Sequence, residues 1–210
     1  HLTEANGRSF LTAVATDSHR LSSSSLEINE INDFKSVILP RKAVYQLCNL
    51  LAETSDKLSM SISENKIKFT LGNIKLISKV IDGKFPDYKK VVPTNNDKTL
   101  LVSTKEFINS IERVTTVSID RKEGVKLLVN KDNLQLSVNS ANSGDGNEKI
   151  QANFSSENLN ISFNSKYLIE IASEIENKDV KINLKDSISP VLIEDMSDKN
   201  SYFVIMPMKI

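Results

Sequence analysis

One short run of the sequence holds side chains that could in principle carry out hydrolysis. The run Thr16-Asp-Ser-His-Arg-Leu contains Asp17, Ser18 and His19, the residue types of an orienting acid, a nucleophile and a base. Residues adjacent in the chain cannot generally point their side chains at one another in such a relay, and no Gly-x-Ser-x-Gly turn accompanies them. A hydrolase is therefore disfavoured. If the chain were one, Ser18→Ala would abolish turnover.

Metal-binding and redox side chains are scarce. The chain has two histidines, His1 and His19, and one cysteine, Cys48, so a zinc site built from several such ligands is excluded. Neither of the glycine-rich nucleotide-binding motifs occurs. We expect no catalytic residue, no metal and no cofactor, and we interpret Cys48 as a small buried side chain on a helix.

The composition is that of a folded, soluble protein. The 210 residues are 39% hydrophobic and 26% charged, which excludes a disordered chain. The 27 basic residues balance the 27 acidic ones, so a strongly basic nucleic-acid-binding protein and an acidic tail are excluded as well. No apolar run approaches the roughly 20 residues that cross a bilayer. With a single cysteine and no signal peptide, we expect a cytoplasmic protein that does not use a membrane.

Two hydrophobic periods run along the chain. Stretches such as 57–63, 66–71, 133–138 and 180–185 alternate apolar and polar residues, which is typical of antiparallel strands with one buried face. Helical spacing occurs at residues 40–51, 104–114 and 165–175, and Ser103 followed by Glu106 predicts a capping box. These elements predict an α+β fold in which sheets dominate and helices cover them.

The order of these elements repeats. A short strand running into a helix begins at Ser36 and again at Asn160, about 124 residues later. We therefore expect two copies of one unit, residues 1–97 and 98–210, joined by the polar stretch that follows Pro93. The second copy opens with a strand and helix, at about residues 100–117, that have no counterpart before His1. We expect the first copy to lack them and the sequence to be a piece of a longer chain.

Two features are open to more than one interpretation. Arg41 and Lys42 lie off the apolar face of the first helix, where they are either solvated charges or contacts to phosphate. Met206 and Met208 would suit a groove that binds several peptides, because methionine repacks easily around different partners. The hydrophobic pattern by itself favours ordinary core residues of a last strand.

Six motifs, in order along the chain, resemble the β sliding clamp family of bacterial DNA polymerase III, the replication processivity factors. They are Ala15-Thr-Asp-Ser-His-Arg-Leu, Val37-Ile-Leu-Pro-Arg-Lys, Asp82-Gly-Lys-Phe-Pro-Asp-Tyr, Phe163-Asn-Ser-Lys-Tyr-Leu, Asp186-Ser-Ile-Ser-Pro-Val and Val204-Ile-Met-Pro-Met. One such motif would be a weak match, whereas six in register are specific.

The resemblance implies a fold and an assembly. Each subunit of the family has three similar domains, with antiparallel sheets outside and helices on the inner face, and two subunits close head to tail into a ring around duplex DNA. Residues 1–97 would then be a second domain without its first strand and helix, and residues 98–210 a complete third domain. Without a first domain the ring cannot close, so we expect this piece to be monomeric.

The resemblance also implies a binding site without catalysis. In the family, the polymerase III catalytic subunit, the clamp loader and repair polymerases insert Gln-Leu-x-Leu-Phe-type peptides into a hydrophobic pocket between the second and third domains. By motif, the pocket residues would be Thr16, Ser18, His19, Arg20, Leu21, Pro86, Lys90, Val91, Asn164, Tyr167, Ile188, Pro190, Val204, Ile205, Met206, Pro207 and Met208. Apolar walls with a few polar groups suit such a role.

Two further sites follow from the same resemblance. Arg41 and Lys42 match the start of a helix that faces DNA, which the ring encircles without reading its sequence. Thr116 and Val117 would face the first domain of a partner subunit. The alternative function, a β-rich secreted adhesion or structural protein, would require glycosylation at Asn153 or Asn160.

Overall fold

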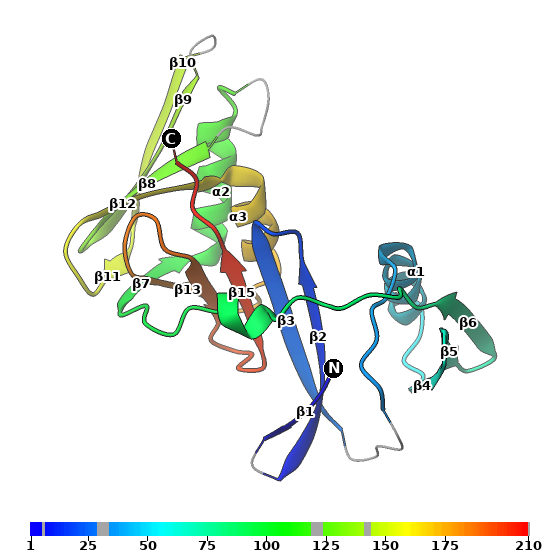
Figure 1. Ribbon diagram of the computed structural model, residues 1–210. Coiled ribbons are helices and arrows are strands. Elements are labelled where there is room, and N and C mark those ends of the chain that lie inside the picture. The colour runs from blue at the N-terminus through cyan, green and yellow to red at the C-terminus, as the bar shows by residue number, and fades with distance from the viewer. Residues whose placement is uncertain (6, 29–33, 119–123, 141–143, 210) are drawn as a thin grey trace. The chain divides into compact units, whose positions relative to one another are not determined.

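A computed structural model describes residues 1–5, 7–28, 34–118, 124–140 and 144–209. These residues form three α-helices and a set of strands whose pairings are all antiparallel, which confirms the predicted α+β class (Figure 1). The chain divides into two compact units. Unit 1 comprises His1–Thr12 and Leu26–Tyr88, and unit 2 comprises Ala13–Ser25 and Lys89–Ile210. Among the described residues, no helix has the length and apolar character needed to span a membrane.

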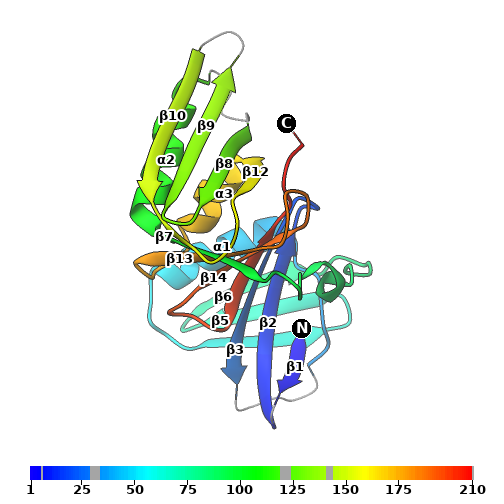
Figure 2. The same cartoon turned by 90° about the vertical axis from the view of Figure 1, so that its left-hand side faces the viewer.

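Unit 2 contains two sheets and two helices. The four-stranded sheet has the order β10 (Gly144–Gln151), β9 (Asn133–Ser140), β8 (Gly124–Asn130) and β12 (Leu159–Asn164) (Figure 2). The larger sheet includes, in this order, β3 (Arg20–Ile28), β15 (Ser201–Ile205), β14 (Val191–Asp195), β13 (Asp179–Leu184), β7 (Lys98–Ser103) and β11 (Asn153–Phe154). The helices α2 (Thr104–Thr115) and α3 (Ser165–Ala172) pack against each other.

The alternation predicted from the sequence produces one continuous apolar core in unit 2. Phe107 and Ile111 of α2 are fully buried, as is Leu134 of β9, and Leu168 of α3 is 1% exposed. β8 and β9 supply every second residue to this core, and the residues between them are more exposed. Burial of this apolar surface is the main stabilisation of the unit.

The helix ends follow local hydrogen bonding. The Ser103 side chain accepts a hydrogen bond from the backbone N–H of Glu106, which confirms the predicted cap of α2. The third predicted helix, 165–175, ends earlier than expected, at Ala172. The hydroxyl of Ser173 donates to the carbonyl of Ile169 at 2.7 Å, a bond that competes with continued helix, yet Ile175 stays buried in the turn that follows.

Unit 1 is smaller and less well covered. It holds β1 (Leu2–Ala5), the first part of β2 (Arg8–Thr16), α1 (Arg41–Ala52) and a three-stranded sheet of β4 (Leu58–Ser63), β5 (Lys66–Leu71) and β6 (Ile74–Lys79). On α1 only Ala43 is buried, while Val44 is 40% exposed. The prediction that Cys48 is buried is wrong: its side chain is exposed, because it projects from the uncovered side of this helix.

One order of elements recurs along the chain. In unit 2, α2 is followed by the meander β8-β9-β10 and α3 by the meander β13-β14-β15. In unit 1, α1 is followed by the meander β4-β5-β6. One helix followed by three antiparallel strands is therefore the structural module of the chain.

The close approach of α2 to β10 predicts an intolerant glycine. A Cβ atom at Gly146 would lie 2.4 Å from the carbonyl oxygen of Val114, so Gly146→Ala must displace backbone. We expect this variant to lose about 1–3 kcal/mol of unfolding free energy, measured by urea denaturation. The neighbouring exposed residue provides the control, since Asn147→Ala should change stability by less than about 0.5 kcal/mol. Equal unfolding midpoints for the two variants would contradict the close approach.

A buried carboxylate predicts acid sensitivity. Burial raises the pKa of Asp195, but hydrogen bonds from the Ser197 hydroxyl and from the backbone N–H groups of Ser197, Glu176 and Asn177 outweigh it, so the pKa is lowered. A lowered folded-state pKa contributes stability that is present above the unfolded pKa of about 4 and is lost as pH falls through the folded value.

We therefore expect Asp195→Asn to destabilise the chain by about 1–3 kcal/mol at pH 7. The variant should also flatten the fall in stability between about pH 5 and pH 3. Urea unfolding across this pH range measures both effects. Asp198→Asn, in the same hairpin, is the control; an identical pH profile for the two variants would refute the assignment.

Candidate functional site

Strand register in unit 2 brings distant segments to one end of a sheet. Ile205, the last residue of β15, lies opposite Arg20, the first residue of β3, and also opposite Val191, the first residue of β14. The residues just before β3, just before β14 and just after β15 therefore leave the sheet together. These are the places of His19, Pro190 and Met206.

The C-terminal segment extends this meeting point to α3. The backbone N–H of Met206 donates to the carbonyl of His19 at 2.9 Å, and that of Met208 donates to the carbonyl of Ser162 at 2.7 Å. Ser162 is near the end of β12, two residues before Asn164, the N-cap residue of α3. We call the resulting cluster the strand-end site and define it as residues 16–21, 164–170, 188–190 and 206–208.

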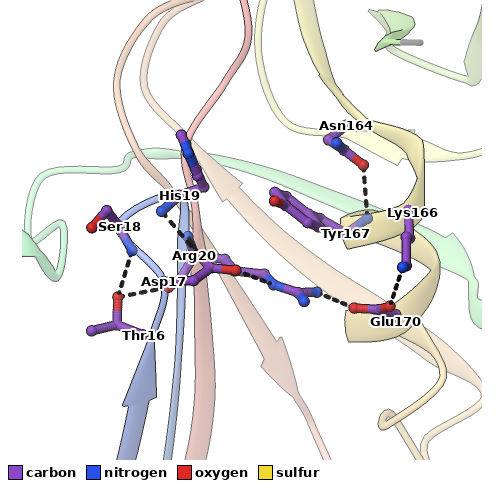
Figure 3. Close-up of polar contacts among 9 residues, drawn as sticks. All are labelled: Thr16, Asp17, Ser18, His19, Arg20, Asn164, Lys166, Tyr167 and Glu170. Carbon is purple, nitrogen blue, oxygen red and sulfur yellow. Dashed lines mark hydrogen bonds and ion pairs between the residues drawn. The ribbon is translucent and has the colours of Figure 1, made fainter. Parts of the chain in front are cut away.

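A tight turn shapes the first segment of the site (Figure 3). One carboxylate oxygen of Asp17 accepts the backbone N–H groups of His19 and Arg20 at 3.1 and 3.0 Å, and the Thr16 hydroxyl donates to the carbonyl of Arg20 at 2.8 Å. Ser18 has φ +73°, a conformation that favours glycine, so the turn is mildly strained. Burial by itself would raise the pKa of the Asp17 carboxylate. The hydrogen bonds from His19 and Arg20 and the charge of the Arg20 guanidinium outweigh this effect, so the pKa is lowered.

This turn does not have the geometry of a hydrolase. Asp17 bonds to the backbone of His19, not to its ring, and among the hydrogen bonds of the described residues none joins the His19 ring to Ser18. A relay needs the base to contact both the nucleophile and the acid. The three residue types are explained by the turn itself.

Arg20 is held from three sides (Figure 3). Its Nε donates to Asp17 at 3.1 Å, its Nη1 donates to Glu170 of α3, and its guanidinium carbon lies 4.2 Å from the centre of the Tyr167 ring. Burial alone would lower the pKa of Arg20, but the hydrogen bonds to Glu170 and Asp17 outweigh it and raise the pKa. The side chain is a fixed cation that is 28% exposed.

The first turn of α3 completes the polar part of the site. Asn164 caps the helix by accepting the backbone N–H of Tyr167 at 3.3 Å. The Tyr167 ring lies 6.4 Å from the His19 ring with an interplanar angle of 30°. Lys166 approaches Glu170 at 3.8 Å, so Glu170 lies between two cations, Lys166 and Arg20.

The apolar residues expected in a pocket fall into two groups. Ile188, Met206 and Met208 are 68%, 41% and 38% exposed. Leu21, Val204 and Ile205 are at most 3% exposed, and of these three Ile205 belongs to the apolar core of unit 2. Pro190 and Pro207 flank the exposed residues.

The remaining predicted residues lie elsewhere. Lys90 and Val91 belong to the 3-10 helix η1 (Tyr88–Val91), and Pro86 lies in unit 1. Arg41 and Lys42 begin α1 and are exposed, whereas Thr116 caps the end of α2 and Val117 packs partly against the core. Two open pockets of unit 2, of about 550 and 460 Å³, are lined by residues outside the strand-end site.

Sequence reasoning missed two members of the site. Glu170 and Lys166 lie on α3 about 150 residues from Arg20, and nothing in their local sequence indicates that they bind an arginine or its partner. Their helical spacing of four residues is the sequence signal from which an ion pair between the two could have been predicted.

Comparison with known proteins gives consistent matches. Residues 3–87 match the family model of the central domain of the DNA polymerase III beta subunit, and residues 89–209 match that of its C-terminal domain. The beta sliding clamp of Caulobacter vibrioides is 32% identical over 211 residues, covering all of this chain and 57% of the relative. That of Escherichia coli K12 is 32% identical over 200 residues, covering 95% and 55%. The chain thus spans little more than half the length of these relatives.

Solved structures agree with the sequence matches. A sliding clamp (DNA polymerase III subunit beta) from Bartonella birtlesii bound to griselimycin has a TM-score of 0.95 and 38% identity, covering all of this chain and 57% of that one. The sliding clamp of Caulobacter crescentus has a TM-score of 0.94 and 32% identity, covering 100% and 56%. Both sequence motifs and fold lead to the same conclusion: the chain belongs to the bacterial β sliding clamp family, the β subunits of DNA polymerase III.

Proposed function

We propose that this chain is the central and C-terminal part of a DNA replication processivity factor, divided near residues 97 and 98. Its role is to tether polymerase III and other partners to duplex DNA, in the cytoplasm. Family membership supports this role, and the same membership makes the chain a clamp and not an enzyme. The activity is therefore binding alone.

The observation that carries the proposal is the exposed apolar group at the strand-end site. Ile188, Met206 and Met208 are exposed on unit 2 beside a fixed arginine and two aromatic rings. Apolar side chains next to a few oriented polar groups are typical of a peptide-binding surface. The occupant we propose is the Gln-Leu-x-Leu-Phe-type segment of the polymerase catalytic subunit, the clamp loader or a repair polymerase.

The rings and the arginine give this surface its selectivity. Tyr167 offers a flat apolar face, while Arg20 and His19 can orient a backbone carbonyl or a glutamine side chain of the peptide. Methionine adapts to leucine and phenylalanine side chains alike, which allows several partners to share one site. Affinity near micromolar, about −8 kcal/mol, would let those partners exchange.

Contact with DNA is assigned to the start of α1. Arg41 and Lys42 occupy the first two positions of this helix, where no acidic residue offsets them. Cations at a helix N-terminus are unfavourable by a few tenths of a kcal/mol, and a phosphate near them would relieve that cost. Two such cations on a chain of zero net charge fit a ring that slides on DNA without gripping it.

The end of α2 is the surface that we expect to contact a second subunit. Thr116 and Val117 would contact the first domain of a second subunit in a head-to-tail homodimer. This contact joins two different surfaces, so the central and C-terminal domains by themselves cannot close the ring, and these 210 residues alone should sediment as a monomer.

Peptide binding tests the proposal directly. A fluorescein-labelled Gln-Leu-x-Leu-Phe peptide titrated with the chain should give saturable binding near micromolar by fluorescence polarisation. Met206→Asp should weaken it at least about tenfold, because binding would bury an unpaired carboxylate. Met196→Asp is the matched control, since Met196 is also 41% exposed but lies in the β14–β15 turn. Equal affinity of the two variants, or no saturable binding by the folded chain, would contradict the site.

Glu170 is expected to hold the Arg20 side chain in the position that binds the peptide. Glu170→Gln removes one of the two carboxylates that bind Arg20. It should weaken binding of the same peptide about threefold to tenfold, because the guanidinium is no longer fixed over Tyr167. The Arg20 Nε–H resonance should also sharpen in NMR spectra. Glu174→Gln, an exposed control just beyond the end of α3, should change neither. An unchanged affinity together with an unchanged resonance in Glu170→Gln would refute the role.

A further inference from the structure

The outer face of the three-stranded sheet in unit 1 carries one kind of charge. Ile67, Phe69 and Leu71 of β5 are buried, so the alternate residues of β5 and their cross-strand neighbours face the other way. This outward set, which we call the lysine face, contains four lysines, three serines, a threonine and an isoleucine: Lys66, Lys68, Lys75, Lys79, Ser59, Ser61, Ser63, Thr70 and Ile77. It contains no carboxylate.

The register sets these lysines against one another. Lys66 lies directly opposite Lys79, and Lys68 lies diagonally between Lys75 and Lys79. Like charges in directly opposite positions destabilise a sheet. None of the four makes an ion pair with a described residue, so this repulsion is not neutralised within the unit.

The fold itself does not require this arrangement. In the corresponding meander of unit 2, the second and third strands are β14 and β15, and no lysine lies opposite another there: Glu194 lies opposite Tyr202, and the other three pairs are apolar. Protection of a sheet edge does not explain it either, because Lys66 and Lys68 are on the central strand β5. The charge is therefore a property of this surface and not of the module.

We propose that the lysine face binds an acidic protein segment that carries an apolar side chain among its carboxylates. Ile77 is 60% exposed and lies opposite Lys68, so the surface offers an apolar contact surrounded by positive charge. The face has no aromatic ring on which a nucleic-acid base could stack, and the exposed Ile77 among its lysines favours a protein segment. It also lies on the side of the sheet away from the buried residues of β5. The proposal is independent of the peptide site in unit 2.

The test uses a fluorescein-labelled peptide of glutamates around a central leucine, and the same peptide with glutamine in place of every glutamate. The folded 210-residue chain should bind the acidic peptide at low salt and the glutamine peptide far more weakly. Lys66→Gln/Lys68→Gln should reduce the affinity about threefold to tenfold. Lys126→Gln/Lys149→Gln removes two exposed lysines from a sheet of unit 2 and should leave the affinity unchanged.

A stability measurement provides an independent arm. Lys79→Glu replaces the repulsive pair with an attractive one, so it should raise the thermal midpoint at low salt and weaken acidic-peptide binding at the same time. Equal binding of the two peptides, equal losses in the two double variants, or a lower midpoint for Lys79→Glu would overturn the proposal. A different outcome would identify a nucleic-acid surface and overturn the proposal. In that case the chain would bind duplex DNA but not the acidic peptide, and Lys66→Gln/Lys68→Gln would weaken DNA binding.

Discussion

The pairing of β3 with β15 is the interaction on which the candidate site depends. It joins residues near position 20 to residues near position 205, and it fixes the turn of Asp17 beside the C-terminal segment. Once these strands are paired, Met206 bonds to His19, and Arg20 reaches across to Tyr167 and Glu170 on α3. A one-residue slip of this register would turn the outward side chains inward and dismantle the site.

Much of the fold could be predicted from hydrophobic periodicity, because burial on one face is a local property of each element. The two longer helices and the strands of both units were found in this way. The apolar spacing continues to Ile175, so it predicts an end of α3 that is three residues too late. In the structure the helix ends at Ala172, and the hydroxyl of the next residue, Ser173, donates to the carbonyl of Ile169. Cys48 was assigned to a core because its helix is apolar, but burial depends on what covers a helix and not on its own pattern.

The candidate site was predictable as a set of residues and not as a geometry. The motif resemblance singled out His19, Arg20 and Tyr167, which do come together. Sequence could not tell that Leu21, Val204 and Ile205 would be buried while Met206 and Met208 stay exposed, since that depends on where β15 ends. Glu170 was missed because an ion pair across 150 residues leaves no local signal. The lysine face shows the same limit: only the strand register reveals that its charges meet.

The methionines offer the most direct measurement of the central claim that the strand-end site is where partner peptides bind. The chain has four, of which Met206 and Met208 belong to the site while Met60 and Met196 lie on other surfaces. In chain labelled with ¹³C at the methionine methyl groups, adding a Gln-Leu-x-Leu-Phe peptide should shift the Met206 and Met208 resonances and leave the other two unchanged. Shifts confined to Met60 or Met196, or no shift in any of the four at saturating peptide, would contradict the account.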